Sequence, residues 1–438
     1  MTEQPLSPGV RRGYSMGSVA TGSFATVPGL LLLPYLTDTL GVAAAVAGAI
    51  VFFPKAWDVL FNPIAGRISD RHQSPRGRRR PFLLWGGIAL ALSFALIFSG
   101  PLEPTLIAGL WVFFMFWAAG TAFAFYQVPY VAMPAEITLN YDERTRIMTW
   151  RVIVLALAIL ISGATAPLVV NAVGGSSGYR VMGWYIAVIL IIGVTGSYFG
   201  TRKAPDYGVA PASASFKEQL KIVAVDKSFR YLLATFVIQA VGVGAMLAGV
   251  AYMSKDVLNN PGATTILFVA FVGPAILFTP LWERVATKRG KKFGYYAASF
   301  VFIAGTLALA LSSADRVYVA YGSAALVGIA YAGLQVFPLA MLPDVASADA
   351  ARTGENRVGV FTGIWTAGET LGMATGPGIY AIALAVGGYV SSTSGDVAQP
   401  ESAVQAIVFG MSLLPAVLVA LSLLALNKYT ERNTDEVR

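Results

Sequence analysis

Long apolar runs separated by short polar loops follow one another along the whole chain. Each run is about 20 residues or longer, which is the length that an α-helix needs to cross the hydrocarbon core of a bilayer. The pattern predicts twelve spans, at residues 14–38, 42–66, 81–100, 105–133, 148–172, 181–200, 230–254, 263–282, 293–312, 316–342, 358–388 and 403–427. We therefore expect an all-α multi-pass membrane protein.

The longest polar segment divides these spans into two equal groups. It covers residues 201–229, contains Pro, Ala and Ser, and lies near the middle of the chain. Such a segment is typical of a linker. We predict an N-terminal six-helix bundle over residues 1–200, a cytoplasmic linker over 201–229 and a C-terminal six-helix bundle over 230–438.

A short basic pattern occurs once in each predicted bundle. "NPIAGRISDRHQSPRGRRRP" places Pro63 four residues before Arg67, and "TPLWERVATKRGKK" places Pro280 four residues before Arg284. Both lie at the step from the second to the third span of their bundle, as expected for a transporter built from repeats. Coincidence between two basic loops is the alternative.

The composition supports the membrane class and excludes several kinds of site. The 438 residues are 56% hydrophobic and 12% charged, with a mean hydropathy of +0.65, which is too apolar for a soluble globular protein. There is no cysteine and one histidine, so disulfides, iron–sulfur clusters and Cys/His zinc sites are excluded. We expect no metal site, no cofactor and, because HExxH and GxxxxGK[ST] are absent, no enzyme.

Basic residues are concentrated on one side of the predicted spans. The net charge is +8, and the loops on the opposite side hold little beyond Arg180, Lys255 and Arg316. Lys and Arg accumulate in cytoplasmic loops, so we expect both termini in the cytoplasm and the protein in the inner or plasma membrane. Because the cations lie in short loops, we expect no nucleic-acid partner.

Charged residues of the cytoplasmic loops are candidates for a gate. Guanidinium groups can bind carboxylates at neighbouring helix ends and hold one face of a two-state transporter closed. The candidates are Asp70, Arg71, Arg78, Arg79, Arg80, Asp142, Arg144, Asp344 and Arg352. For the arginines of residues 67–80 the alternative is an orientation signal, which is compatible with a gate, and for the others it is a solvated loop.

Three ionisable residues lie inside predicted spans. Lys55 and Asp58 are three residues apart in the second span, so they share one helix face and can form an ion pair. Glu369 lies in the eleventh span, and it can pair with Lys55 across the halves or line a water-filled pore. A charge near the bilayer centre costs several kcal/mol unless it is paired, and it usually marks a transport or proton path.

Aromatic and amide side chains of the spans are candidates for a solute site. Aromatic faces stack on sugar rings, and amides bond hydroxyl groups. The candidates are Tyr126, Gln127, Tyr130, Gln335, Trp365 and Thr366. Aromatic residues in membrane helices also act as packing or interface anchors, which is the alternative for each ring.

Four motifs resemble the melibiose permease group, the glycoside–pentoside–hexuronide:cation symporter branch of the major facilitator superfamily. They are "WDVLFNPIAGRISDR" (57–71), "GRRRPFLLWG" (77–86), "VPYVAMPAEITLNYDERTRIMTWR" (128–151) and "AMLPDVASADAARTGENRVGVFTG" (340–363). "GRRRPF" is also similar to the sucrose-transporter relatives of that branch. The resemblance implies a major facilitator fold, with a central cavity between its two halves.

The resemblance also implies a cation site. That group has a basic residue at the Lys55 position, and aspartates at the positions of Asp58 and Asn62 that coordinate sodium or lithium or carry a proton. This chain departs from the pattern, since Asn62 is an amide. Glu369 takes the place of a lysine that usually lies beside the cation site, so the sign is reversed.

Three further positions are matched to the sugar site of that group. Gln127 replaces an acid that contributes to both cation and sugar binding, and the acid expected near Thr21 is missing. Arg151 corresponds to an arginine that the group uses near its binding site.

We therefore expect a symporter that moves a sugar or glycoside-type solute by alternating access. Sodium prefers several oxygen ligands, more than one of them anionic, whereas a proton needs one buried carboxyl group, so we expect coupling to protons. The expected partners are a small-molecule substrate, the coupling cation and membrane lipids, and the expected state is a monomer. The alternatives are a sodium- or proton-coupled transporter of lysolipid or another amphipathic solute, and a transporter-like receptor that does not transport.

Overall fold

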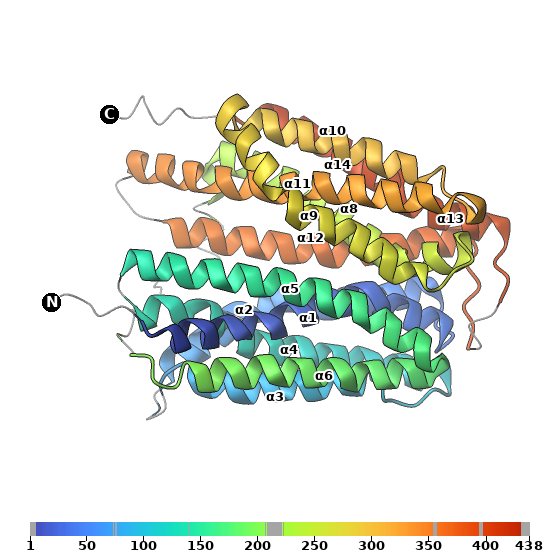
Figure 1. Ribbon diagram of the computed structural model, residues 1–438, viewed down its shortest axis with the longest axis horizontal. Coiled ribbons are helices and arrows are strands. Elements are labelled where there is room, and N and C mark those ends of the chain that lie inside the picture. The colour runs from blue at the N-terminus through green and yellow to red at the C-terminus, as the bar shows by residue number, and fades with distance from the viewer. Residues whose placement is uncertain are drawn as a thin grey trace. The chain divides into compact units, whose positions relative to one another are not determined.

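The computed structural model describes residues 6–72, 74, 77–138, 140–205, 207, 221, 223–353, 357–393 and 397–430, and all regular structure among them is helical. The first six helices are α1 (Pro8–Asp38), α2 (Ala44–Arg71), α3 (Arg80–Ile97), α4 (Thr105–Ile137), α5 (Tyr141–Val173) and α6 (Gly175–Gly200) (Figure 1). The later ones are α8 (Lys227–Tyr252), η1 (Met253–Val257), α9 (Ala263–Arg289), α10 (Lys291–Leu309), η2 (Ala314–Arg316), α11 (Val317–Thr353), α12 (Val358–Val386), α13 (Glu401–Met411) and α14 (Leu413–Lys428).

The helices have the length and composition of membrane spans, and the predicted fold class is confirmed. Eleven helical segments of the described residues are long and apolar enough to cross a membrane. The 29-residue α12 is not among them, because "GETLGMATGPG" adds a glutamate, a proline and several glycines. Large apolar side chains stay exposed on the spans, as at Leu106 (73%) and Leu277 (75%), where lipid would cover them.

The chain forms two compact units with the same internal packing. In the unit of Met1–Ser213 and Ser391–Val397, α1 packs against α5 and α6, α3 against α4 and α6, and α2 against α4. In the unit of Ala214–Val390 and Ala398–Arg438, α8 packs against α12 and α14, α10 against α11 and α14, and α9 against α11. The second unit repeats the helix pairs of the first in chain order, as expected for an internal repeat.

Glycines let the central helix of each unit approach its neighbours. A Cβ at Gly13 of α1 would overlap the backbone of Gly200 in α6. In the other unit, a Cβ at Gly376 of α12 would overlap the backbone of α8 at Gly244 and Ala245. Small residues at such crossings provide backbone contact where no hydrophobic effect drives helices together.

The last predicted span is divided in two. The backbone breaks at Ser412, with φ −118° and ψ −76°, between α13 and α14. Pro415 follows within the first turn of α14. Hydropathy does not predict this break, because the apolar run of residues 406–426 continues through Ser412.

Candidate functional site

The site predicted from Lys55 and Asp58 lies on α2, within the first unit. The Lys55 Nζ is 3.7 Å from Asp58 Oδ2, and Asp58 is only 3% exposed. The two residues are one helical turn apart, as the spacing predicts. Asn62 follows one turn later on the same helix and is half-buried. The predicted ion pair is therefore present inside a membrane-spanning helix.

The second oxygen of Asp58 is left unpaired. Asp58 Oδ1 is buried and has no hydrogen-bond partner among the described residues. It faces Gly120 of α4, where an added Cβ would lie 2.7 Å from that oxygen. A buried oxygen without a partner is costly, so this atom is open to a proton or a bound ligand.

Three phenylalanine rings lie beside the Lys55 ammonium. Its Nζ lies 4.6 Å from the ring centroid of Phe24 in α1, and 5.8 Å from those of Phe116 and Phe123 in α4. Each of these distances is within the range of a cation–π interaction. These rings were not predicted, because no spacing rule joins residues of three different helices.

Two candidates for solute binding contact one another in the same unit. The Thr21 hydroxyl of α1 donates a hydrogen bond to Gln127 Oε1 of α4 at 2.7 Å. Thr21 is 8% exposed, and Gln127 is half-buried. The pair holds a hydroxyl and an amide together, which is chemistry suited to a sugar hydroxyl.

Tyr126 and Tyr130 of α4 are fully buried and join α4 to α1. The Tyr126 hydroxyl donates to the Gly17 carbonyl at 3.0 Å, and the Tyr130 hydroxyl donates to the Tyr14 carbonyl at 2.9 Å. The Tyr14 hydroxyl returns a bond to the Tyr130 carbonyl at 3.1 Å. In this structure the two candidates pack helices together, and Tyr14 is a member of the network that the sequence did not indicate.

Arg151 of α5 lies beside this network. Its guanidinium carbon is 5.5 Å from the ring centroid of Tyr130. The cation therefore lies near the ring of a candidate residue, and Arg151 itself is half-buried.

The candidates of the second unit lie on α11 and α12. Gln335 donates from Nε2 to the Tyr331 hydroxyl at 2.6 Å, and that phenol is within electrostatic range of Glu369. Among the described residues no cation forms an ion pair with Glu369. The structure thus places Tyr331, which the sequence did not indicate, in a hydrogen bond with Gln335 and in electrostatic range of Glu369.

Trp365 and Thr366 differ in exposure. Trp365 is 2% exposed and stacks on Phe236 of α8 with ring centroids 4.4 Å apart, and its indole nitrogen has no partner among the described residues. Thr366 is exposed, and its hydroxyl donates to the Thr362 carbonyl at 3.0 Å.

Arg79 is the centre of an ion-pair network at one end of the first unit. Its guanidinium group binds Glu136 at 2.8 Å, Asp70 at 2.6 Å and the Ser69 hydroxyl at 2.8 Å. Arg79 is 8% exposed and Glu136 only 3%. The predicted contact between the basic loop and carboxylates is present within this unit, and Glu136 is a partner that sequence reasoning missed.

The other gate candidates are spread around the ends of their own helices. Arg71 is exposed, Arg80 donates to the Ala204 carbonyl, and Arg144 donates to the Thr138 carbonyl at 3.1 Å. Arg78 is half-buried. The side chain of Asp142 lies outside the described residues.

The second unit has its own ion pairs at the matching helix ends. Lys291, at the start of α10, binds Asp344 of α11 at 2.6 Å. Arg352 binds Asp349 at 2.6 Å, and Arg357 lies 3.9 Å from the same carboxylate. The ion pair between α10 and α11 corresponds to the ion pair of Arg79 and Glu136 between α3 and α4. The internal repeat therefore includes an ion pair at the same place in each unit.

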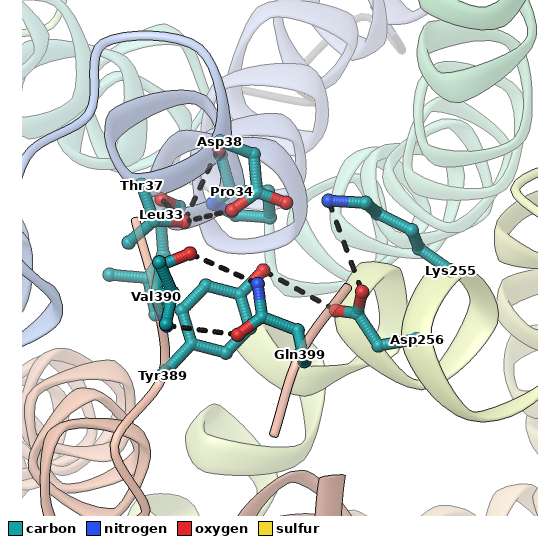
Figure 2. Close-up of polar contacts among 9 residues, drawn as sticks. All are labelled: Leu33, Pro34, Thr37, Asp38, Lys255, Asp256, Tyr389, Val390 and Gln399. Atoms are coloured by element: carbon teal, nitrogen blue, oxygen red, sulfur yellow. Dashed lines mark hydrogen bonds and ion pairs between the residues drawn. The ribbon is translucent and has the colours of Figure 1, made fainter. Parts of the chain in front are cut away.

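Figure 2 shows polar contacts that include the opposite helix ends of the second unit. The Tyr389 hydroxyl donates to Asp256 Oδ2 at 3.3 Å, and Lys255 Nζ is 3.9 Å from Asp256 Oδ1. The Gln399 amide exchanges two hydrogen bonds with the Val390 backbone, at 2.9 and 3.0 Å. These contacts link the segment after α12 to η1 and to the residues before α13. They include no predicted site residue.

An apolar cavity lies within the second unit. Its cavity volume is about 40 Å³. Its lining comes from α8, α9, α10, α11 and α13 and includes Val243, Met246, Phe268, Phe271 and Met411. The Phe271 ring lies 5.0 Å from that of Tyr331, so the cavity adjoins the polar group of α11.

The comparison with protein families decides the class. The family described as MFS/sugar transport protein matches residues 13–430. The chain belongs to this family. Relatives named as a putative glycoside/cation symporter, a glucuronide carrier protein homologue and an isoprimeverose transporter confirm its resemblance to the glycoside–pentoside–hexuronide:cation symporter branch. Among the described residues no group of three or more His, Cys, Asp or Glu side chains could hold a metal ion.

Relatives of this MFS protein match along most of their length. An uncharacterized symporter of Synechocystis sp., sll1374, is 25% identical over 92% of this chain and 90% of its own. An isoprimeverose transporter of Lactiplantibacillus pentosus is 24% identical over 96% of this chain and 88% of its own.

Solved structures show the same fold. A bacterial homologue of the human lysosomal transporter Spinster, solved in an inward-facing and occupied conformation, matches with a TM-score of 0.71 and 12% identity. The alignment covers 96% of this chain and 94% of that one. At this identity the match defines the fold alone, and the protein has the major facilitator fold.

Proposed function

We propose that this MFS protein is a cation-coupled symporter of a sugar or glycoside-type solute that works by alternating access in the cell's inner or plasma membrane. The observation that carries the proposal is the ion pair of Lys55 and Asp58 inside a membrane-spanning helix, with Lys55 Nζ 3.7 Å from Asp58 Oδ2. Such a pair is expensive to keep in a membrane and marks a transport path. The family and the names of the relatives support a sugar-type solute.

The coupling ion that we propose is a proton. Asp58 has one oxygen near Lys55 and one without a partner, so one site is open on a single carboxylate. Asn62 is an amide, and Gln127 already accepts a bond from Thr21. Sodium is held by several oxygen ligands, whereas a proton needs a single buried carboxyl group. Glu369 is a second carboxyl group that can carry it.

Each unit, taken by itself, has polar side chains that we propose for solute binding. In the first unit these are Thr21, Gln127 and Arg151, which lie on α1, α4 and α5. In the second they are Gln335 and Thr366, on α11 and α12. Hydroxyl, amide and guanidinium groups together suit a ligand with many hydroxyl groups.

The network of Arg79 belongs to the proposed cytoplasmic gate. A buried hydrogen-bonded network of charges has discrete arrangements, and this suits a two-state element. With both termini in the cytoplasm, as the loop charges predict, Arg79, Asp70 and Glu136 lie at the cytoplasmic end of their helices.

The apolar cavity of the second unit favours a second candidate, transport of an amphipathic solute such as a lysolipid. Its lining is apolar, and the Phe271 ring of that lining lies 5.0 Å from the ring of Tyr331, which accepts a hydrogen bond from Gln335. An apolar lining of this kind favours contact with an acyl chain.

Two measurements test the proposal. A thermal-shift screen of the purified protein against glycosides, hexuronides and lysolipids identifies the solute, because a ligand that binds only the folded form raises the melting temperature. Counterflow in proteoliposomes then tests movement, and we expect labelled solute to enter vesicles preloaded with unlabelled solute. Saturable binding without exchange would instead show a receptor.

A further inference from the structure

Glu369 is a carboxylate without a counter-ion inside the second unit. It lies well inside α12 and is half-buried. Among the described residues it forms no hydrogen bond and no ion pair. A charged group within a bilayer costs several kcal/mol unless it is paired. Glu369 therefore calls for a positive partner.

The helices around Glu369 do not supply that partner. α12 contains no Lys or Arg, and α11 contains only Arg352, which lies in its last turn and binds Asp349. The basic residues of α8, which packs against α12, are Lys227 and Arg230 at its start. Within the described part of these helices, the partner of Glu369 is then either a proton or a cation that arrives with a ligand.

Hydrogen-bond acceptors near Glu369 favour a ligand. Tyr331 of α11 lies within electrostatic range of Glu369, and its hydroxyl accepts a bond from Gln335 Nε2 at 2.6 Å. Because that bond engages the amide nitrogen, the Gln335 oxygen is left as an acceptor. A carboxylate, an amide oxygen and an aromatic ring together suit an ammonium group, which carries a positive charge and three N–H donors. A proton on Glu369 would use only the carboxylate.

Trp365 adds a hydrogen-bond donor on the same face of α12. It precedes Glu369 by four residues, about 6 Å along the helix axis. Its ring stacks on Phe236 at 4.4 Å, and its buried indole nitrogen has no partner among the described residues. A buried donor without a partner costs free energy, so a ligand oxygen that accepts from it would bind favourably. A site for an ammonium group next to a donor for a hydroxyl oxygen suits an amino sugar.

We propose that Glu369 binds the ammonium group of an aminated sugar. Gln335 and Tyr331 complete the ammonium site, and the Trp365 indole donates to a hydroxyl oxygen of the same sugar. The inference rests on the proposed function, since it names the class of its solute, and it leaves the proton to Asp58. The resemblance implies a lysine at the Glu369 position, so the reversed charge gives this chain its own solute preference.

The test measures binding to the purified protein, so it does not depend on transport. The probes are the methyl glycosides of glucosamine, galactosamine and mannosamine at neutral pH, each paired with its N-acetylated form, which keeps the ring but has no charge. For wild type we expect a saturable rise in melting temperature with at least one amine, and a response at least about tenfold weaker to its N-acetylated form. Lysophosphatidylcholine is the lipid probe, and a response to it alone overturns the assignment to a sugar.

Variants separate the charge of Glu369 from its shape. Glu369→Gln is expected to bind the amine at least about tenfold more weakly, because hydrogen bonds to a charged group are the strong ones. Without ligand it should melt no lower than wild type, because it loses an unpaired charge. Tyr331→Phe keeps the ring but releases Gln335, and a loss of about 2- to 10-fold is expected. Glu283→Gln, at an exposed carboxylate of α9, is the matched control and should bind as wild type.

Three outcomes overturn the inference. They are a wild type that responds to none of the amines, an unchanged amine response in Glu369→Gln, and a Glu369→Gln variant that melts clearly lower without ligand or does not fold, since that would show a structural partner for the carboxylate. Counterflow of a neutral glycoside without any amine response would contradict the inference alone. Amine binding through Glu369 without counterflow would contradict the proposed function alone.

Discussion

At the scale of residues, the protein places its few buried charges in contact with specific partners. Asp58 meets Lys55 on its own helix, whereas Arg79 meets Glu136 at a sequence separation of 57 residues. Both carboxylates are 3% exposed. At such burial, water cannot offset the cost of desolvating a carboxylate, so the stability of its charged form depends on the ion-pair partner.

Arg79→Gln tests the network at the end of α3. The change leaves Glu136 buried without its cation, and removing one partner of a buried ion pair costs about 3–5 kcal/mol. We expect a clearly lower melting temperature in detergent. Arg71→Gln, at an exposed position, is the matched control and should change stability by less than about 0.5 kcal/mol. Equal melting of the two variants would contradict a structural role for the network.

Local spacing explains which residue contacts could be predicted. Lys55 and Asp58 lie three residues apart on one helix, and helical geometry alone brings them together. The phenylalanine rings near Lys55 and the carboxylate of Glu136 contact their partners from other helices. The spacing of residues in a single sequence does not indicate such contacts. The burial of Tyr126 and Tyr130 was equally hidden, since a ring that lines a cavity and a ring that joins two helices look the same in sequence.

At the scale of elements, each unit is built around one central helix that packs against two others. In the first unit this is α1, against α5 and α6, and in the second it is α8, against α12 and α14. Apolar run lengths predicted these helices well, because a membrane-spanning helix must satisfy its backbone internally. They did not predict the break at Ser412, because nothing in the hydropathy changes there.

Gly13→Leu tests the crossing of α1 and α6. The added side chain would meet the Gly200 backbone, and overpacking of this kind costs about 1–3 kcal/mol or more. We expect a lower melting temperature and weaker expression. Gly273→Ala in α9, where an added Cβ meets nothing within 4 Å, is the control and should be neutral or slightly stabilising. A Gly13→Leu protein as stable as wild type would contradict the close crossing.

At the scale of the whole molecule, the chain has a transporter fold, and within each unit the residues that we propose for coupling and for gating lie at different levels of the helices. The proposed coupling pair, Lys55 and Asp58, lies within α2, and the ion pairs of Arg79 and Lys291 lie at helix ends. This separation suits alternating access, in which ends open and close while the ion site stays within the membrane.

The orientation of the chain is tested by labelling from each side. The protein has no cysteine, so Ser74→Cys and Ser394→Cys each introduce a single thiol. With both termini in the cytoplasm, the thiol at position 74 should label from the cytoplasmic face and the thiol at position 394 from the opposite face. The wild-type protein, which has no cysteine, is the control for background labelling. Labelling of both thiols from one side would contradict the predicted topology.

The central claim, proton-coupled symport through Asp58, is tested most directly by gradient-driven uptake of the identified solute into proteoliposomes. An inward proton gradient should drive accumulation of the solute by wild type, and an uncoupler should abolish that accumulation. Asp58→Asn should lose accumulation while keeping part of its solute exchange, because the amide cannot carry the proton. Uptake that ignores the pH gradient and the uncoupler but rises steeply with external sodium would contradict the account.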